Sequence, residues 1–327
     1  MSAKLQLFLE VLSKVFLLLP KNKKGGKPVT HSHASFVLFF MIMYFKKIYE
    51  YQAMERYLKV HYKAFGFSSV PSRKTIQRRK DQLPNLLSFL IPNLAKNCAN
   101  LNRKIFGFSF GFVDKSVFRA LGGLWHKKDM QTGRVPHPSI DTEASWAKSA
   151  YHGWRFGYGL HLICNKNRFP ISACVTTASV KDYNFLERLI EPIKDFIGVV
   201  IGDSGYFCLR NLQRIYENWD IFVQTPKIYE NITEKTKDWF KKVYNDLVQT
   251  SVAQRTYLQR KPSVEPCFAL IKELFDLTQE LQLPFKGLKS NETFLMMTVL
   301  CVQLLMYDNF KNGQPLQNTD SFLQIFR

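Results

Sequence analysis

The sequence lacks any pair of cysteines spaced for metal binding or redox chemistry. Its six cysteines, at positions 98, 164, 174, 208, 267 and 301, are widely separated and form no CxxC pair. This spacing argues against a zinc site and against a thioredoxin-like motif. We therefore expect free thiols, mostly buried, in a protein of the reducing cytoplasm.

The sequence also lacks an apolar run long enough to cross a membrane. The longest runs cover residues 5–19, 36–45 and 294–307, and all are shorter than the roughly 20 residues that span a bilayer. The first run contains Glu10 and Lys14 and has no small-residue cleavage site, so we expect no secretory signal. No membrane partner is expected, and a membrane protein is the least favoured function class.

Acidic residues are scarce. The 327 residues include 26 Asp and Glu against 46 Lys and Arg, a formal net charge of +20. Residues 1–100 alone hold 17 basic and 4 acidic residues. A positive field of this size attracts polyanions, whereas a merely solvated surface would carry both signs more evenly. The expected partner is nucleic acid, held mainly by the N-terminal region.

The composition is that of a folded protein with more than one structural region. It is 46% hydrophobic and 22% charged, which excludes a disordered or collagen-like chain, and no internal repeat is present. The length favours a core domain with an accessory region. We expect a helical, basic DNA-binding region at 1–100 with an exposed linker at 21–30, a second domain at 101–310, and a tail at 311–327.

A helix-turn-helix motif is expected at about residues 52–82. Helical patterning extends from His33 to about Tyr62, and after a short turn Ser72 is placed to cap another helix. Ile76 can dock that helix on its partner. A solvated basic helix is the alternative interpretation. The residues expected to reach phosphates and base edges in the major groove are Arg73, Lys74, Gln77, Arg78 and Lys80.

From residue 105 onward the apolar pattern becomes that of strands. Short segments rich in β-branched and aromatic residues predict strands at 105–113, 156–165, 169–179, 198–203 and 221–225. Helices are predicted at 182–196, 209–219 and 254–282, while 227–250 has no assignment. The order predicts an α/β fold, in which a mixed sheet is flanked by helices and follows the helical N-terminal region.

Three acidic residues are notable for their positions. Asp114 follows the first predicted strand, and Asp203 follows the fourth and opens the turn DSGY. Glu265 lies in a predicted helix whose apolar residues face the core. Two strand ends and a helix can converge, and bound cations would relieve the repulsion among three carboxylates. Taken singly, each acid is more simply a turn or surface residue.

Several segments in this region resemble the DDE transposases of bacterial insertion sequences. FVDKS contains Asp114, and VIGDSGY contains Asp203. The resemblance covers roughly residues 105–310, with the segments in the correct order. Three further segments that resemble the family are DTEASWAKS at 141–149, GWRFGYGLHLI at 153–163 and TTASVKDYNFL at 176–186.

The signature of this family is Tyr, two residues, Arg, three residues, Glu, six residues, Lys. The interval from Glu265 to Lys272 matches it, and Tyr257 and Arg260 precede Glu265 in the correct order. The interval from Arg260 to Glu265 is one residue too long, and Lys261 stands where the family usually has Arg. Either Arg260 or Lys261 is therefore expected to meet a phosphate.

The resemblance implies an RNase H-like fold and a transposase that hydrolyses DNA at transposon ends and joins the freed 3′-OH to target DNA. It implies two divalent cations, Mg²⁺ or Mn²⁺, held by Asp114, Asp203 and Glu265. It also implies a homodimer in the bacterial nucleoid that binds terminal inverted repeats and target DNA. The catalytic-domain residues implied to contact DNA are Tyr257, Arg260, Lys261 and Lys272.

One residue departs from the family pattern. The family has Lys where this chain has Gly159, before Leu160 and His161. His161 is expected to be a structural histidine of a strand. Four aromatic residues could stack on a nucleotide base, although core packing is expected for each; they are Trp125, Trp146, Trp154 and Phe207.

Other functions are also compatible with the sequence. A nuclease of the same fold would cleave DNA without strand transfer. A non-catalytic DNA-binding protein derived from a transposase would depend on residues 1–100 alone, but the presence of all three acids argues against it. Cut-and-paste transposition is the expected route, and copy-and-paste transposition stays open.

Overall fold

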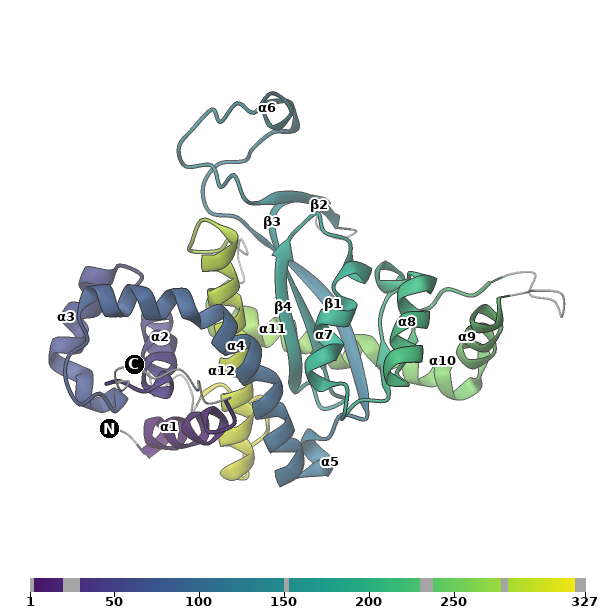
Figure 1. Ribbon diagram of the computed structural model, residues 1–327, viewed down its shortest axis with the longest axis horizontal. Coiled ribbons are helices and arrows are strands. Elements are labelled where there is room, and N and C mark those ends of the chain that lie inside the picture. Colours follow the sequence, from purple (N-terminus) through teal and green to yellow (C-terminus); the bar gives the residue numbers. More distant parts are fainter. Residues whose placement is uncertain (1–2, 20–29, 150–152, 230–237, 278–281, 321–327) are drawn as a thin grey trace.

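A six-stranded mixed sheet forms the centre of the protein in the computed structural model, which describes residues 3–19, 30–149, 153–229, 238–277 and 282–320. Helices lie in front of the sheet and behind it, and the N-terminal helices gather beside it (Figure 1). The strands are β1 (Phe110–Arg119), β2 (Ser145–Ser149), β3 (Gly153–Cys164), β4 (Pro170–Thr177), β5 (Val199–Ile201) and β6 (Phe222–Gln224).

The strand order confirms the expected RNase H-like arrangement. Neighbouring strands follow the order β2-β3-β1-β5-β6, and β4 also pairs with β3. β3 is antiparallel to β1, β2 and β4, whereas β1, β5 and β6 are parallel. The short strand β2 was not predicted. The first predicted strand begins too early, because its first two residues belong to α5 (Arg103–Phe106).

Four helices, α1 (Ala3–Phe16), α2 (His33–Phe45), α3 (Tyr51–His61) and α4 (Arg73–Leu101), form the N-terminal region. The helical stretch predicted from His33 to Tyr62 is interrupted, because α2 ends at Phe45 and Lys47 takes a left-handed backbone with φ 54°. Nearly every side chain of α2 is buried, as expected for a helix that is apolar all round.

Helix α4 begins where the sequence predicts. Ser72 caps it, because the Ser72 hydroxyl accepts a hydrogen bond from the Thr75 backbone N–H at 3.3 Å. The helix then continues for 29 residues, with Pro84 and Pro92 inside it. Its second half packs on β4 and on α12 (Leu288–Lys311), so that α4 joins the basic N-terminal region to the sheet.

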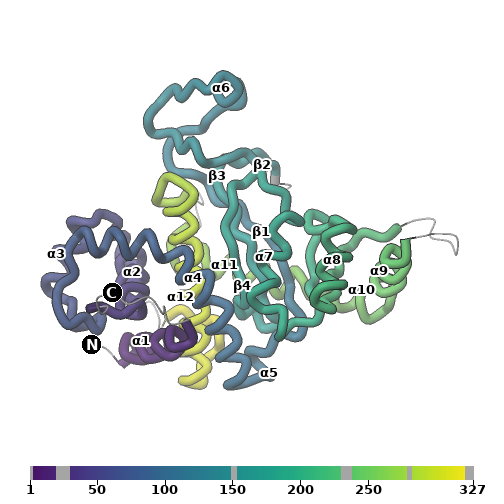
Figure 2. The backbone as a smooth tube through the Cα atoms, in the orientation of Figure 1, coloured from purple at the N-terminus to yellow at the C-terminus, as the bar shows by residue number. Residues whose placement is uncertain are grey.

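Helix α12 is long and apolar enough to cross a membrane, yet 89% of its most apolar window is buried inside the protein. It lies beside α4 and next to the sheet, where it packs on both α4 and β4 (Figure 2). The Gln303 side chain donates hydrogen bonds at 2.9 Å to the backbone carbonyls of Ile91 and Pro170, which links α12 to α4 and β4. These contacts are those of the core helix of a folded protein.

The other helices cover the sheet or extend beyond it. α7 is short and flanked by 3-10 turns within the predicted 182–196, and α8 has the predicted bounds. The unassigned 227–250 contains α9, and the predicted 254–282 divides at Gln259. The bounds are α6 (Lys127–Thr132), α7 (Leu186–Ile190), α8 (Leu209–Trp219), α9 (Trp239–Gln249), α10 (Ser251–Leu258) and α11 (Arg260–Leu274).

The six cysteines are free thiols, as predicted, and all except Cys208 are fully buried. Most of the linker predicted at 21–30 and the end of the predicted tail, 321–327, lie outside the described residues. The helical N-terminal region and the helix-flanked sheet confirm the predicted fold class.

Candidate functional site

Asp114 and Asp203 lie side by side where two parallel strands stop pairing. The pairing of β1 with β5 ends at Phe112 and Ile201, and each aspartate follows two residues later. Residues two apart on an extended strand share a face, so both carboxyl groups point to the same side. The sequence had predicted Asp114 at the end of its strand. Asp114 instead lies inside β1, because β1 continues to Arg119 through its pairing with β3.

Asp114 is a partly buried acid with a cationic partner. Its Oδ1 accepts a hydrogen bond from the Lys115 backbone N–H at 2.8 Å, and its Oδ2 accepts one from Arg260 Nη1 at 2.9 Å. Burial raises the pKa of Asp114 to about 6, against the opposing effect of Arg260, and the nearby charge of Asp203 raises it further. A carboxyl group perturbed in this way is typical of a functional site.

Asp203 caps a tight turn and has a second acidic neighbour. Its Oδ1 accepts a hydrogen bond from the Gly205 N–H at 2.9 Å. A Cβ atom on Gly205 would lie 2.7 Å from Asp182 Oδ2 and 3.0 Å from Asp203 Oδ1, so glycine leaves the room that these two acids need. Asp182 was not predicted from the sequence as a site residue, although it lies in 176–186, one of the segments that carry the resemblance.

Arg260, the first residue of α11, is the helix residue that reaches the aspartates. Burial is the largest single influence and lowers the pKa of Arg260, but the charges of Asp114, Tyr257 and Asp203 and the hydrogen bond to Asp114 together outweigh it and raise that pKa. Its Nε atom is buried and has no hydrogen-bond partner among the residues that the structure describes. Of the two residues considered for the Arg position, Arg260 therefore lies in the site and Lys261 is exposed.

Glu265 is an exposed residue of the same helix. The buried side of α11 includes Val264, Phe268 and Ile271, as predicted. Glu265 follows Arg260 by five residues, which is about 140° around an α-helix, and it is exposed. The residue that meets Asp114 in this structure is therefore Arg260 and not Glu265.

The carboxylates of Asp114 and Asp203 have the right chemistry for a divalent cation. Carboxylate oxygens are the ligands that Mg²⁺ and Mn²⁺ prefer, and two adjacent acids gain from a shared cation. However, no group of three or more His, Cys, Asp or Glu side chains is arranged to hold a metal within the described ranges. The two aspartates fit such an ion, while Glu265 is not gathered with them and Arg260 contacts Asp114 instead.

The remaining predicted residues of this region lie around α10 and α11. The Lys272 Nζ atom is 5.9 Å from the centre of the Phe118 ring, and burial lowers the pKa of Lys272. Tyr257, on α10, is half-buried and packs against the core. Lys272 is half-buried beside β1, and because it follows Glu265 by seven residues, about two helical turns, the two residues lie on one side of α11.

His161 is a structural histidine, as predicted. It is buried, with its ring nitrogens 3.2 Å from the Tyr206 hydroxyl and 3.1 Å from the Thr176 hydroxyl. Burial lowers the pKa of His161 to about 3, with a smaller contribution from Lys115. The imidazole is therefore neutral near pH 7 and serves as a hydrogen-bonded part of the sheet.

The basic residues at the start of α4 divide into two groups. Arg73, Lys74, Gln77 and Arg78 are exposed, while Ile76 is buried as predicted. Several of them line a surface hollow of about 470 Å³. By contrast, the ammonium of Lys80 lies 4.4 Å from the centre of the Phe285 ring and is half-buried.

The connection between α3 and α4 spans 62–72. It is longer than the usual helix-turn-helix turn of roughly three or four residues.

Residues 109–304 match the sequence family described as "Transposase DDE domain". This match covers more than half of the chain and includes Asp114, Asp203 and Glu265. No curated protein matches the sequence. A cryo-EM structure of a piggyBac transposase synaptic complex with hairpin DNA is similar at 10% identity with a TM-score of 0.43, covering 100% of this chain and 77% of that chain. This likeness is too weak to argue from, and the family match carries the assignment.

Proposed function

Because the chain belongs to the transposase DDE domain family, we propose that it cleaves the terminal inverted repeats of a transposon and joins the freed 3′-OH to target DNA. The observation that carries this proposal is the placement of Asp114 beside Asp203 within the matched region. The net charge of +20 supports DNA as the substrate. An origin in a bacterial insertion sequence, with the Tyr-Arg-Glu-Lys signature, belongs to the same proposal.

The cofactor that we propose is a pair of Mg²⁺ or Mn²⁺ ions held by Asp114, Asp203 and Glu265. When bound, such ions activate water and neutralise charge on the phosphate. Asp114 and Asp203 would supply the first ligands, because they are already adjacent. Glu265 would complete the set by joining the two aspartates, with which it is not gathered among the described residues.

Arg260 is the group that we expect DNA to move. Its unsatisfied Nε donor and its charge suit a phosphate, which arginine binds through two parallel hydrogen bonds. A phosphate that draws Arg260 away would free Asp114 and allow α11 to turn Glu265 inward. Tyr257, Lys261 and Lys272 are proposed to contact DNA on the same side of the molecule.

We propose that residues 1–100 bind DNA and that residues 101–310 form the catalytic domain. The exposed side of α4, with Arg73, Lys74, Gln77 and Arg78, would lie in the major groove. Lys80 would support this helix through its aromatic contacts. A homodimer would hold two transposon ends together.

The test is Mg²⁺- or Mn²⁺-dependent cleavage and joining of DNA with the sequences that flank this gene. Glu265→Gln should abolish both reactions and leave DNA binding intact. Glu273→Gln is the matched control, because Glu273 is also exposed on α11. Equal activity of the two variants would exclude Glu265 from the site.

The same assay separates the alternative functions. Cleavage without joining would identify a nuclease. Binding without cleavage by the folded parent would identify a non-catalytic descendant of a transposase.

A further inference from the structure

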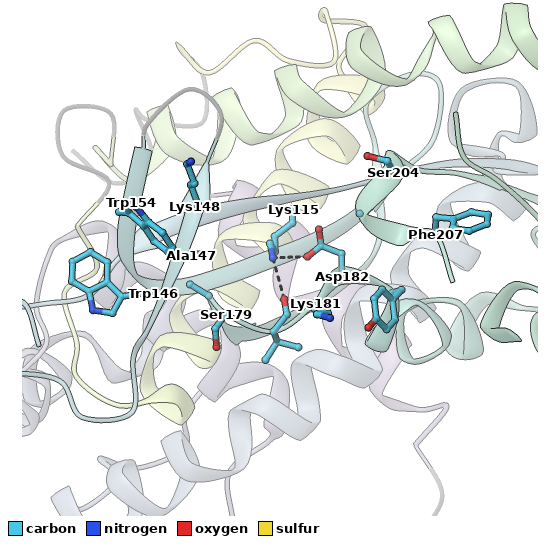
Figure 3. A pocket seen from close by; sticks show the side chains of 14 residues that line it. Lys115, Trp146, Ala147, Lys148, Trp154, Ser179, Lys181, Asp182, Ser204 and Phe207 are labelled. Carbon is cyan, nitrogen blue, oxygen red and sulfur yellow. Dashed lines mark hydrogen bonds and ion pairs between the residues drawn. The ribbon is translucent and has the colours of Figure 1, made fainter. Parts of the chain in front are cut away.

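A groove of about 520 Å³ lies beside the aspartates and is assigned no role by the reaction proposed above. Ser204 and Gly205, the two residues after Asp203, line one side of it. Trp154 and Lys148, at the β2–β3 end of the sheet, line the other side, and Lys115 lies between the two sides (Figure 3). The groove therefore begins next to the acid pair and leads away from it across the sheet.

An ion pair between Lys115 and Asp182, whose charges balance each other, lies in the middle of the groove. The Lys115 ammonium pairs with Asp182 and donates a hydrogen bond to the Val180 carbonyl at 3.2 Å. Gly159 makes room for this lysine, because a Cβ atom there would lie 2.9 Å from Lys115 Cδ. Asp182 is the one acidic residue among the described lining residues, and Lys115 already balances its charge.

The charge that is left in the groove is positive. Lys148 and Lys181 both line it, in addition to Lys115. Lys127, from the neighbouring α6, lies with its ammonium 4.2 Å from the centre of the Trp154 ring. Lysines on both sides of a groove favour an anion that extends along it, such as a phosphodiester backbone.

Trp154 provides a flat apolar surface in this basic groove. The sequence had predicted that it packs in the core, but 55% of the residue is exposed. Trp146, in contrast, packs partly against the core and donates a hydrogen bond from Nε1 to the Trp125 carbonyl at 2.6 Å. An exposed indole among lysines combines the two features of a single-strand site, in which bases stack on aromatic rings and lysines follow the backbone.

We propose that this groove binds a single DNA strand next to the phosphate that the acid pair acts on. A base would stack on Trp154, and the adjacent phosphates would lie at Lys148 and Lys181. A single strand is favoured over a duplex because the bases of a duplex are already stacked on one another and leave no face for Trp154. The inference rests on the proposed function, since it takes the strand at the groove to be the one that reaches Asp114 and Asp203.

The test measures binding of a fluorescein-labelled oligothymidine of about ten nucleotides, a length within the range of single-strand sites. The full-length protein is titrated without divalent metal, and fluorescence anisotropy gives Kd. Trp154→Ala should weaken binding by roughly ten-fold, whereas Trp154→Phe should retain most of the affinity. Trp239→Ala is the matched control, because Trp239 is 48% exposed on α9, away from the groove.

Two further measurements separate stacking from charge. An abasic oligomer of equal length should bind the parent as weakly as oligothymidine binds Trp154→Ala. A duplex of equal length should bind the parent and Trp154→Ala equally. If Trp154→Ala and the parent bind oligothymidine equally, or if the abasic oligomer loses no affinity, the proposal is overturned.

A crosslink tests the site without relying on a variant. Oligothymidine in which one base is 5-iodouracil should form a photocrosslink at Trp154 in the parent protein. A crosslink confined to residues 1–100 would overturn the groove as the binding site.

Asp203→Asn distinguishes failure of this inference from failure of the proposed function. This variant should lose cleavage but keep the affinity for oligothymidine. If the parent fails to cleave any DNA while Trp154→Ala still weakens binding, the groove stands and the transposase proposal fails. If the parent cleaves and joins DNA while Trp154→Ala changes no affinity, the groove inference alone fails.

Discussion

The guanidinium Nη1 of Arg260 lies 2.9 Å from Oδ2 of Asp114, so that a cation of the protein itself balances a partly buried catalytic candidate. The same arginine is close enough to Asp203 for its charge to be felt there. A metal ion and Arg260 are therefore competitors for one carboxylate.

Replacing Arg260 should strengthen metal binding in the absence of DNA. Arg260→Gln removes the competing charge, and we expect Mn²⁺ to bind about ten-fold more tightly by isothermal titration calorimetry, a typical coupling for a close charge pair. Arg255→Gln, on the exposed side of α10, should leave the affinity unchanged. Unchanged or weaker Mn²⁺ binding by Arg260→Gln would show that the arginine does not compete with the ion.

The pKa of Asp114 should appear in the pH dependence of stability. Its folded pKa is raised from 3.8 to about 6, so its contribution to stability is present below pH 3.8 and is lost as pH rises through about 6. With chelator present, the free energy of unfolding of the parent should fall relative to that of Asp114→Asn over this window, by up to about 3 kcal/mol.

Urea unfolding at a series of pH values measures this difference. A difference between Asp114→Asn and the parent that stays constant with pH would contradict the raised pKa.

Removing the positive charge of Arg78 should affect DNA binding, whereas removing that of Lys80 should affect thermal stability. Arg78→Gln, on the exposed side of α4, should weaken duplex binding and reduce the slope of log K against log salt by about 0.9, the value for one lost phosphate contact. Lys80→Gln should instead lower Tm, because Lys80 lies over the Phe285 and Tyr51 rings. Salt titrations and thermal melts test the pair, and equal salt slopes for the two variants would refute the assignment of the exposed side to DNA.

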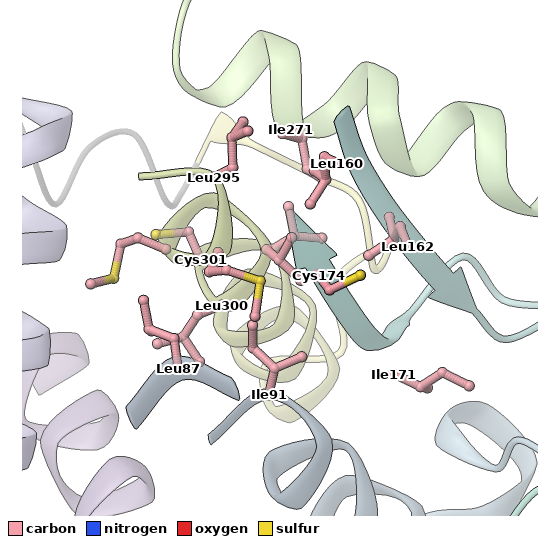
Figure 4. Close-up of a cluster of buried hydrophobic side chains, with 14 of the residues drawn as sticks. Leu87, Ile91, Leu160, Leu162, Ile171, Cys174, Ile271, Leu295, Leu300 and Cys301 are labelled. Atoms are coloured by element: carbon pink, nitrogen blue, oxygen red, sulfur yellow. The ribbon is translucent and has the colours of Figure 1, made fainter. Parts of the chain in front are cut away.

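Truncating Leu300 should destabilise the whole protein. Leu300 is fully buried on α12, near Leu87 and Ile91 of α4 (Figure 4). Leu300→Ala should lower the free energy of unfolding by about 2–5 kcal/mol, the usual cost of emptying a core site. Leu258→Ala, at a position that is 74% exposed, should change it by less than about 0.5 kcal/mol. Similar losses for the two variants would mean that α12 is not a central core helix.

The acid pair could be predicted from the sequence because local rules determine it. An apolar strand followed by a polar residue and a glycine turn places Asp203 correctly, and the same reasoning places Asp114 near it. The Ser72 cap was predictable for the same reason, since its hydrogen bond spans only three residues.

Features that depend on long-range packing could not be predicted. The division of α10 from α11 at Gln259 determines which side of α11 faces the sheet. The spacing of Arg260 and Lys261 from Glu265 did not determine which of the two basic residues lies in the site. The exposure of Trp154 could not be predicted, because an apolar residue is expected in the core and its sequence neighbours do not indicate otherwise. β2 was missed because its five residues pair only with β3.

Helix α12 packs on α4, β4, α2 and α11, all of which precede it in the sequence. During synthesis the ribosome therefore completes the N-terminal helices and the sheet before the helix that joins them exists. Until α12 emerges, the apolar surface that it covers on α4 and β4 stays exposed, which is the condition under which nascent chains aggregate or recruit chaperones. Of these elements, the last to be made is thus the one that joins the N-terminal helices to the sheet.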